Sequence, residues 1–252
     1  MAYDFCLSLG GSCSAAIQLK RRGLRMASLP FDWLLACDRH CFAKALEVVE
    51  RVRAGDEGGW LMDIERIEPP HAGPGLGPWQ YRDRRMGFEF LHDFHCDVAS
   101  DANRHFLDDV HEVYRRRFVR LVAWLEKAKH VLLVLDCPFD FSVDELRELR
   151  EGWSRAFPSV DFELVAILWQ QANPGEEALD HLRIRRLARP KHRYDNESTT
   201  PVWDFLDEVS VTEADSHPQP VRRLPLRYRF LRLMFLASRK LLRQGGWLSS
   251  VE

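Results

Sequence analysis

Residues 3–22 read Tyr-Asp-Phe-Cys-Leu-Ser-Leu-Gly-Gly-Ser-Cys-Ser-Ala-Ala-Ile-Gln-Leu-Lys-Arg-Arg. The stretch begins with a short aromatic and apolar run, 3–7, that predicts a strand, and residues 15–22 have the spacing of an amphipathic helix. Gly10 and Gly11 lie between them and allow a tight turn with unusual backbone angles. A strand, a glycine turn and a helix start together predict a side chain held at the edge of a sheet.

Two later apolar runs, 131–136 and 162–168, are typical of strands buried on both faces. Apolar residues recur at helical spacing in 101–129 and 143–156. Strands that alternate with helices predict a three-layer α/β fold, with a mostly parallel sheet, helices on both faces and Cys13 at the end of the first strand. We also expect one or two helices within 31–53, strands at 60–67 and 86–92, a loop at 69–78 and a polar-faced edge strand at 182–187.

The bulk composition is that of an ordinary soluble globular protein, with 252 residues, 46% hydrophobic residues and 29% charged residues. A formal net charge of -2 predicts no nucleic-acid partner. The N-terminus shows no basic and apolar leader, and no apolar run approaches the roughly 20 residues of a membrane span. Six cysteines in such a chain favour the reducing cytoplasm over a disulfide framework. We therefore expect a cytoplasmic protein.

The C-terminal residues 221–252 differ from the rest of the chain, which we interpret as a single α/β domain, 1–220. Between Arg222 and Arg243 basic residues are frequent, acidic ones are absent, and an apolar stripe runs through the segment. A basic amphipathic helix of this kind suits an anionic membrane surface, here the inner membrane face. The alternative is a final helix packed on the domain with a solvated basic face.

Cys13 lies where the first predicted helix begins. The first-turn N–H groups and the helix dipole favour an anion there and lower the pKa of a thiol. Cys13 is therefore the candidate nucleophile, and we assign Gly10, Gly11, Ser12 and Ser14 to substrate binding, with N–H groups near Gly11 and Ser14 as an oxyanion hole. The alternative is that Ser12 or Ser14 caps the helix and Cys13 is a small buried apolar residue.

A thiolate nucleophile works with a histidine base, and His92 is our candidate among the ten histidines. It lies in Phe-Leu-His-Asp-Phe, 90–94, where the apolar flanks indicate the end of a partly buried strand. Asp93 is assigned to binding, because neighbours on a strand point to opposite faces and Asp93 would not orient His92 directly. The alternative for His92 is a core histidine with satisfied hydrogen bonds.

Three further residues complete the predicted site. Pro30 sets an extended approach to Asp32, which we place near the Cys13 loop as an orienting group; the alternative is a helix N-cap. Arg116 and Arg120 lie near each other on one helix and could hold a phosphate or carboxylate. The alternative for these arginines is a solvated face balanced by acidic neighbours.

Cysteines and histidines with ligand-like spacing occur twice, in the groups Cys37, His40, Cys41 and His92, His95, Cys96. Such residues bind zinc in tetrahedral sites. However, no Cys-x-x-Cys pair occurs, and positions 37 and 41 also have the spacing of core residues on a helix. We therefore assign no metal and no cofactor.

Four motifs line up along the chain: Ser8-Leu9-Gly10-x-x-Cys13, Ser28-x-Pro30-Phe31-Asp32-Trp33, His92-Asp93-Phe94 and Tyr114-x-Arg116-Arg117-x-x-Arg120. Together they resemble DUF1796, a bacterial family of unknown function that carries the label of a papain-like cysteine peptidase. The resemblance covers about the first half of the chain and implies Cys13 as nucleophile with His92 as its partner. It also adds a papain-like α+β arrangement as the alternative fold. The oxyanion-hole glutamine that papain-like proteases place shortly before the cysteine is missing here.

The Gly-Ser-Cys start is similar to that of the GSCFA-type relatives of SGNH hydrolases. Asp215-Ser216-His217 has the late position that SGNH-type hydrolases give to their Asp and His, although no Gly-Asp-Ser surrounds the nucleophile. Two functions follow from these observations. The first is a cysteine-dependent hydrolase or acyltransferase acting on a small-molecule, peptide or glycan substrate. The alternative is a non-catalytic protein that binds an anion or sugar phosphate and assists bacterial glycan assembly at the inner membrane face.

Overall fold

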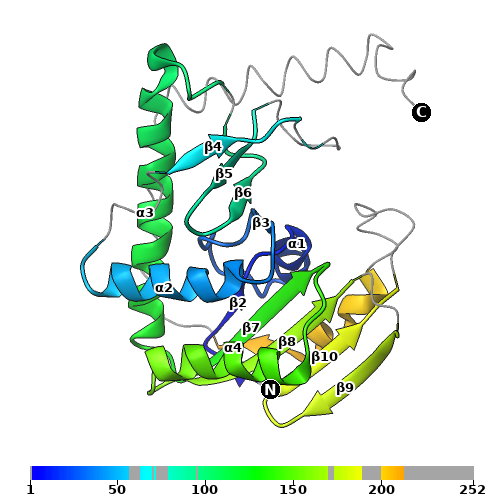
Figure 1. Ribbon diagram of the computed structural model, residues 1–252. Helices are drawn as coiled ribbons and strands as arrows, with labels where there is room; N and C mark the ends of the chain where they lie inside the picture. Colours follow the sequence, from blue (N-terminus) through cyan, green and yellow to red (C-terminus); the bar gives the residue numbers. More distant parts are fainter. Residues whose placement is uncertain are drawn as a thin grey trace.

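The computed structural model describes residues 2–56, 63–69, 71, 79–94, 96–169, 173–188 and 200–212. Its larger sheet has the strand order β2-β7-β8-β10-β9 (Figure 1). The first four strands are parallel to their neighbours, whereas β9 is antiparallel to β10. The strands are β2 (Phe5–Ser8), β7 (His130–Cys137), β8 (Asp161–Leu168), β9 (Gly175–Leu179) and β10 (Leu182–Arg186).

The larger sheet is therefore mixed, and the prediction that 182–187 forms an edge strand is wrong. β10 lies between β8 and β9, and the edge is β9, whose residues are all exposed. The sequence Gly-Glu-Glu-Ala-Leu of β9 has no alternation of apolar and polar residues, because neither of its faces is buried. It is held by pairing with β10 across a turn in which His181 adopts a left-handed φ of 55°.

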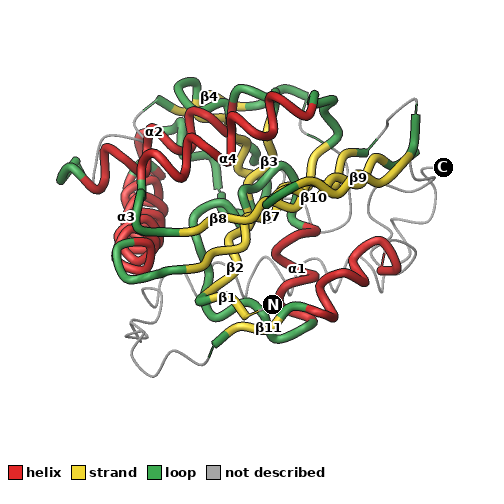
Figure 2. The backbone as a smooth tube through the Cα atoms, turned by 90° about the horizontal axis from the view of Figure 1, so that it is seen from below, coloured by secondary structure: helices red, strands yellow, loops and turns green. Residues whose placement is uncertain are grey.

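Each face of the larger sheet has its own hydrophobic core. Leu133 and Leu135 of β7 point into a core shared with three helices, whereas Leu132 and Val134 point into a second core shared with α1 and η3. Figure 2 shows α2 and α4 on one side of this sheet and α1 on the other. The helices are α1 (Ser14–Arg21), α2 (Cys41–Arg53), α3 (His105–Leu125), α4 (Val143–Ala156) and the 3-10 helices η2 (Asp101–Asn103) and η3 (Thr200–Glu208).

A second, antiparallel sheet has the order β3-β6-β5-β4, and a single parallel-sheet architecture does not account for it. The structure is thus a mixed α/β fold. The prediction of helix throughout 31–53 is wrong at its start, because β3 precedes α2 and buries Leu34 and Ala36. The strands are β3 (Leu34–Ala36), β4 (Ile64–Arg66), β5 (Tyr81–Asp83) and β6 (Phe88–Phe90), and a separate pair joins β1 (Ala2–Tyr3) to β11 (Ser210–Val211).

Aromatic side chains join the antiparallel sheet to the rest of the fold. Phe31 is fully buried, and its ring lies 5.9 Å from that of Phe88 in β6 and 5.5 Å from that of Phe118 in α3. Phe90 of β6 similarly contacts Tyr114 of α3, with ring centroids 5.4 Å apart. These contacts fix the chain around Phe31 between β6 and α3.

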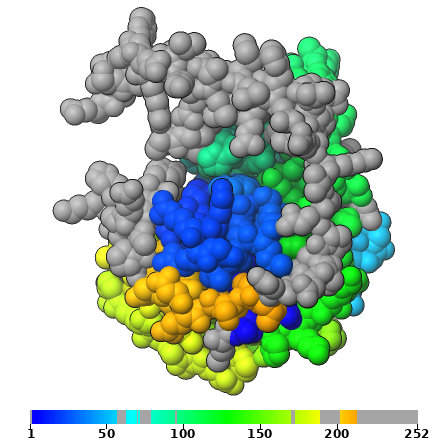
Figure 3. Space-filling view, turned by 180° about the vertical axis from the view of Figure 1, so that it is seen from behind, coloured from blue at the N-terminus to red at the C-terminus, as the bar shows by residue number. Residues whose placement is uncertain are grey.

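Residues 200–212 pack beside the N-terminal segment, as Figure 3 shows in orange and blue. Arg22, just after α1, forms an ion pair of 2.6 Å with Asp207 of η3. In the described ranges, no helix is long and apolar enough to cross a membrane. The basic helix expected at 221–252, Asp215-Ser216-His217, His95 and most of the loop at 69–78 lie outside the described residues.

Candidate active site

Cys13 lies at the start of α1, directly after the loop that leaves β2. It is the N-cap residue of this helix, and its side chain is partly exposed. Gly10 and Gly11 precede it with φ angles of 83° and 91°, in the left-handed region that glycine adopts without strain. The loop thus presents Cys13 beyond the carboxyl end of β2, which is where largely parallel sheets bind ligands.

The Cys13 loop is fastened to the neighbouring strand through Asp136, a fully buried residue near the end of β7. Its carboxylate accepts hydrogen bonds from the Ser12 hydroxyl and from the indole N–H of Trp169. A Cβ at Gly11 would lie 2.4 Å from the Asp136 carbonyl oxygen, so only glycine fits here. The sequence analysis did not assign Asp136 to the site. The signal that could have identified it is an acidic residue at the end of the apolar run 131–136.

Ser12 and Ser14 have different roles at the helix start. The Ser14 N–H donates to Ser12 Oγ over 3.1 Å, so Ser12 satisfies a first-turn amide while its own proton goes to Asp136. The Gly10 N–H donates to Ser8 Oγ over 3.3 Å. Ser12 and Ser8 therefore hold the loop in shape around Cys13.

His92 follows β6 and is partly exposed. Its imidazole meets the indole of Trp33 in an edge-to-face contact, with ring centroids 6.5 Å apart and planes at 81°. The strand register brings the two rings together, because Leu34 of β3 pairs with Phe90 of β6. Trp33 directly precedes β3, and His92 is the second residue after β6.

Asp32 is buried and only 2% exposed. Its Oδ2 accepts hydrogen bonds from the Leu29 N–H at 2.8 Å and from the Arg25 guanidinium, whose nearer nitrogen is 2.7 Å away. Arg25 in turn stacks on the Trp33 ring, 5.1 Å from its centroid. Asp32 therefore caps neither α1 nor α2, and its contacts lead to Trp33 through Arg25.

Arg116 and Arg120 each make a polar contact with a different segment of the chain. Arg116 Nε donates to the Glu112 carbonyl at 3.2 Å and lies 3.5 Å from the Glu112 carboxylate. Arg120 reaches across to donate to the Ser28 carbonyl oxygen at 2.9 Å. Burial and the nearby Arg117 and Arg116 guanidinium groups lower the pKa of Arg120, so these cations lie near one another. The expected joint phosphate or carboxylate site therefore stays a prediction.

The side chain of Asp93 points toward α3. Its carboxylate accepts a hydrogen bond of 2.9 Å from the Tyr114 hydroxyl, and Arg117 stacks on the Tyr114 ring at 4.7 Å. The Arg120 contact with Ser28 belongs to the same packing of α3 against the motif at 28–33. The motifs at 28–33, 92–94 and 114–120, far apart in the sequence, thus meet around Trp33 and His92.

One backbone approach joins the Cys13 loop to this cluster. A Cβ at Gly10 would lie 3.2 Å from the Phe31 carbonyl oxygen and 3.4 Å from that of Leu34. These carbonyls flank Asp32 and Trp33 in the chain. The segment that holds Trp33 against His92 therefore also supports the loop that presents Cys13.

Three of the other described cysteines, Cys6, Cys96 and Cys137, are less suited to act as thiolates. Burial raises the pKa of Cys6 to about 12 and also raises the pKa of Cys137. Burial, followed by the nearby Asp97 carboxylate, raises the pKa of Cys96. None of these three lies at a helix start, where first-turn N–H groups would stabilise the anion.

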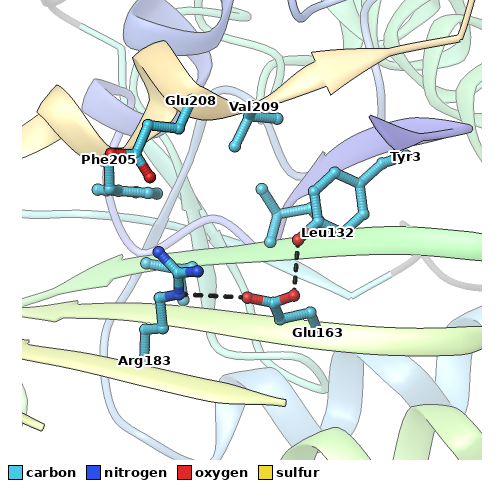
Figure 4. A pocket seen from close by; sticks show the side chains of 8 residues that line it. Tyr3, Leu132, Glu163, Arg183, Phe205, Glu208 and Val209 are labelled. Atoms are coloured by element: carbon cyan, nitrogen blue, oxygen red, sulfur yellow. Dashed lines mark hydrogen bonds and ion pairs between the residues drawn. The ribbon is translucent and has the colours of Figure 1, made fainter. Parts of the chain in front are cut away.

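A small pocket lies away from Cys13, between the larger sheet and η3 (Figure 4). Inside it the Tyr3 hydroxyl donates to Glu163 at 2.6 Å, and Arg183 Nε lies 3.4 Å from the other oxygen of that carboxylate. Burial and the Glu163 hydrogen bond raise the pKa of Tyr3. The pocket has a volume of about 30 Å³, which is enough for one or two water molecules. We therefore interpret it as a small gap in the packing, lined by the hydrogen-bonded side chains of Tyr3, Glu163 and Arg183.

The fold and the site define a mixed α/β protein with a cysteine at a helix start and a histidine beyond an antiparallel strand. Residues 4–172 match the family described as "Putative papain-like cysteine peptidase (DUF1796)", and the chain belongs to this family. The match includes the Cys13 loop, His92 and the motif at 114–120. The similarity to GSCFA-type proteins has no such support.

A similar curated protein is "Uncharacterized protein R408" of Acanthamoeba polyphaga mimivirus. It is 25% identical over 142 residues, which are 52% of this chain and 60% of that protein. The chain thus matches less than two thirds of this relative's length. The relative is viral, so it gives no support to the expected bacterial setting. No solved structure matches the chain.

Proposed function

We propose that this protein is a cysteine-dependent hydrolase in which Cys13 is the nucleophile and His92 the general base. The observation that carries the proposal is the placement of Cys13 at the N-cap of α1, partly exposed and held by two left-handed glycines. Membership of a family described as papain-like cysteine peptidases supports the same assignment. In a helix start of this kind the thiolate is stabilised by unpaired first-turn N–H groups.

In the proposed reaction, His92 takes the thiol proton as Cys13 Sγ attacks the carbonyl carbon of the substrate. The oxyanion that forms is bound by backbone N–H groups of the loop near Gly11 and of the first helical turn after Ser14, whose own N–H already donates to Ser12 Oγ. The protonated His92 then gives its proton to the leaving group, which departs and leaves a thioester on Cys13. Water, deprotonated by His92, hydrolyses the thioester and restores the thiol; an acceptor alcohol or amine in place of water would make the protein an acyltransferase.

The remaining contacts of the site have a positioning role in this proposal. Trp33 restricts the His92 ring, and Arg25 packs over the Trp33 ring while paired with Asp32. Asp136 holds Ser12 and so the loop that carries Cys13. These buried supports substitute for the orienting residue that a cysteine–histidine pair requires.

The anion-binding alternative has weaker support, because Arg116 and Arg120 already contact Glu112 and Ser28. We therefore give priority to the hydrolase. We also propose that the substrate is an amide or ester, carried by a peptide, a glycan or a small molecule.

The test is the rate of Cys13 alkylation by iodoacetamide between pH 5 and pH 9, followed by mass spectrometry of the Cys13 peptide. In the wild type we expect alkylation at least about tenfold faster than at Cys96 near pH 6, because a helix-start thiolate persists there. His92→Ala should remove much of this advantage, and Cys96→Ser should leave it unchanged. A Cys13 thiol that titrates near 8.5, with no effect of His92→Ala, would overturn the proposal.

A panel of fluorogenic amides, esters and thioesters provides the activity readout. We expect hydrolysis of at least one class by the wild type and its loss in Cys13→Ala, while Cys96→Ser retains the wild-type rate. Equal turnover by wild type and Cys13→Ala would exclude Cys13 as the nucleophile for that substrate.

A further inference from the structure

The side chains of Cys37, Asp38 and Cys41 lie close together between the end of β3 and the start of α2. The two sulfur atoms are 3.9 Å apart. Cys37 Sγ lies 3.6 Å from Asp38 Oδ2, and Cys41 Sγ lies 3.6 Å from Asp38 Oδ1. Two thiols and a carboxylate thus form a compact triangle, separate from Cys13 and His92.

The sulfur–sulfur separation and the separation of Cys37 Sγ from Asp38 Oδ2 match two edges of a tetrahedral zinc site, and one ligand atom from each residue lies within 4.8 Å of the others. Bonds of about 2.3 Å to sulfur and about 2.0 Å to oxygen place two sulfur ligands about 3.8 Å apart, and a sulfur and an oxygen ligand about 3.5 Å apart. A disulfide, in contrast, requires the sulfurs to approach to about 2.05 Å, far inside their present 3.9 Å. We propose that Cys37, Asp38 and Cys41 bind a zinc ion or a similar thiophilic divalent cation, with solvent in the fourth position.

The surroundings of the triangle fit a site built for a bound group. Gly87, at the turn between β5 and β6, covers it so closely that a Cβ would lie 2.9 Å from Cys41 Sγ and 3.0 Å from Cys37 Sγ. Its φ of 75° also favours glycine. The Cys37 N–H donates to the Gly87 carbonyl at 3.2 Å, so the turn is tied to the triangle.

Asp38 is oriented by the backbone of the helix start. Its Oδ1 accepts hydrogen bonds from the N–H groups of His40 at 2.7 Å and Cys41 at 3.2 Å. Supporting bonds of this kind fix a metal-binding carboxylate in place. Cys37 and Asp38 are partly exposed, which gives a cation access from solvent.

The position of the triangle indicates a structural role. β3 and β6 are paired, and the triangle lies at the end of this pair near Gly87, whereas Trp33 and His92 lie at the opposite end. A bound metal would fasten the start of α2 to the turn that leads into β6. The inference does not depend on the chemistry proposed for Cys13.

The test uses the full chain, purified under reducing conditions, stripped with a chelator and titrated with Zn²⁺ or Co²⁺. We expect one metal per chain by elemental analysis, thiolate-to-cobalt charge-transfer absorption, and a higher melting temperature with Zn²⁺. Cys37→Ser should abolish the charge-transfer band, and Asp38→Asn should weaken binding at least about tenfold, as expected for losing a ligand or its support. Cys96→Ser, another partly exposed cysteine, should behave as the wild type.

The proposal is overturned if the reduced, folded wild type binds no stoichiometric Zn²⁺ or Co²⁺. It is also overturned if Cys37→Ser and Asp38→Asn bind metal as the wild type does. Both positions are partly exposed, and asparagine keeps the oxygen that accepts the helix-start N–H groups, so these variants are expected to fold even if one at buried Cys41 does not. Circular dichroism confirms folding before each titration.

Discussion

The indole of Trp33 and the imidazole of His92 meet edge to face, with ring centroids 6.5 Å apart. The Arg25 guanidinium lies over the same indole, 5.1 Å from its centroid, and forms an ion pair with the buried Asp32. His92, the proposed general base, is thus connected to the buried Asp32 through contacts with Trp33 and Arg25. This arrangement limits the directions in which His92 can turn.

Trp33→Ala should slow the alkylation of Cys13 near neutral pH by about tenfold to about a hundredfold, because a small displacement of a catalytic group costs this much. The reason is that the freed imidazole no longer holds its orientation toward the thiol. The measurement is the pH profile of iodoacetamide alkylation at Cys13, together with turnover of any fluorogenic substrate found.

Trp33→Phe is the matched control, since it keeps an aromatic edge beside His92 and should retain most of the rate. A merely structural role for Trp33 would lower the melting temperature of the alanine variant without changing the shape of the pH profile. An unchanged profile in folded Trp33→Ala would mean that Trp33 does not position His92.

Gly11→Ala tests the fastening of the Cys13 loop to β7. The new Cβ would lie 2.4 Å from the Asp136 carbonyl oxygen, so the loop must move. Gly55→Ala provides the comparison, because Gly55 has a similar φ of 95° but nothing within 4 Å of its Cβ position. Both variants bear backbone strain, and Gly11→Ala should lose about 1–3 kcal/mol more in its free energy of unfolding, the usual effect of overpacking.

Urea denaturation measures the difference between these two glycine variants. Cys13 alkylation should also slow in Gly11→Ala and remain at the wild-type rate in Gly55→Ala. Equal losses of stability in the two variants would show that the approach to Asp136 can relax without cost.

Local patterns in the sequence were sufficient to predict several elements. The helix at 143–156 was placed correctly, because its apolar spacing is regular and Ser142 and Glu145 form a capping box at its start. The strands near 131–136 and 162–168 also stand out, since both of their faces are buried. The strand, glycine loop and helix around Cys13 follow from a pattern within 20 consecutive positions, 3–22.

The supports of the site were not predictable in this way. Ser12 and Asp136 bond across 124 positions of the chain, and no local pattern indicates such a partner. β3 has only three residues, which is too short for alternation to distinguish it from the start of the helix that follows. The arginines at 116 and 120 share a helix face by spacing, but no local pattern indicates that Arg120 bonds to the Ser28 carbonyl oxygen, 92 positions earlier in the chain.

Arg120→Ala should lower the free energy of unfolding by about 1.5–3 kcal/mol, because it leaves the Ser28 carbonyl without a charged donor. Arg116→Ala is the control on the same helix and should change stability by no more than about 0.5 kcal/mol, as expected for an i,i+4 pair. Thermal or urea unfolding of the two variants checks this. Equal effects would mean that the Ser28 contact adds nothing beyond ordinary surface pairing.

Asp83 should make stability depend on pH. Burial raises its pKa above the usual carboxyl value, even though the N–H groups of Arg85 and Met86 donate to Oδ1. Its Oδ2 is buried and has no hydrogen-bond partner within the part of the chain that the structure describes. The folded state therefore binds a proton more tightly than the unfolded chain does, and the stabilisation present at low pH is lost as pH rises through the raised pKa.

Asp83→Asn should remove this loss, since asparagine keeps an oxygen for the two N–H groups and carries no charge into the interior. We expect the variant to gain stability relative to the wild type by about 1 kcal/mol at pH 7, with a smaller gain at pH 4, because a lower pH favours the uncharged form of a carboxyl whose pKa is raised in the fold. Urea denaturation at both pH values measures the two differences. A gain that is the same at both pH values would show that Asp83 does not titrate in this range, because removal of a non-titrating group cannot change the slope of stability with pH.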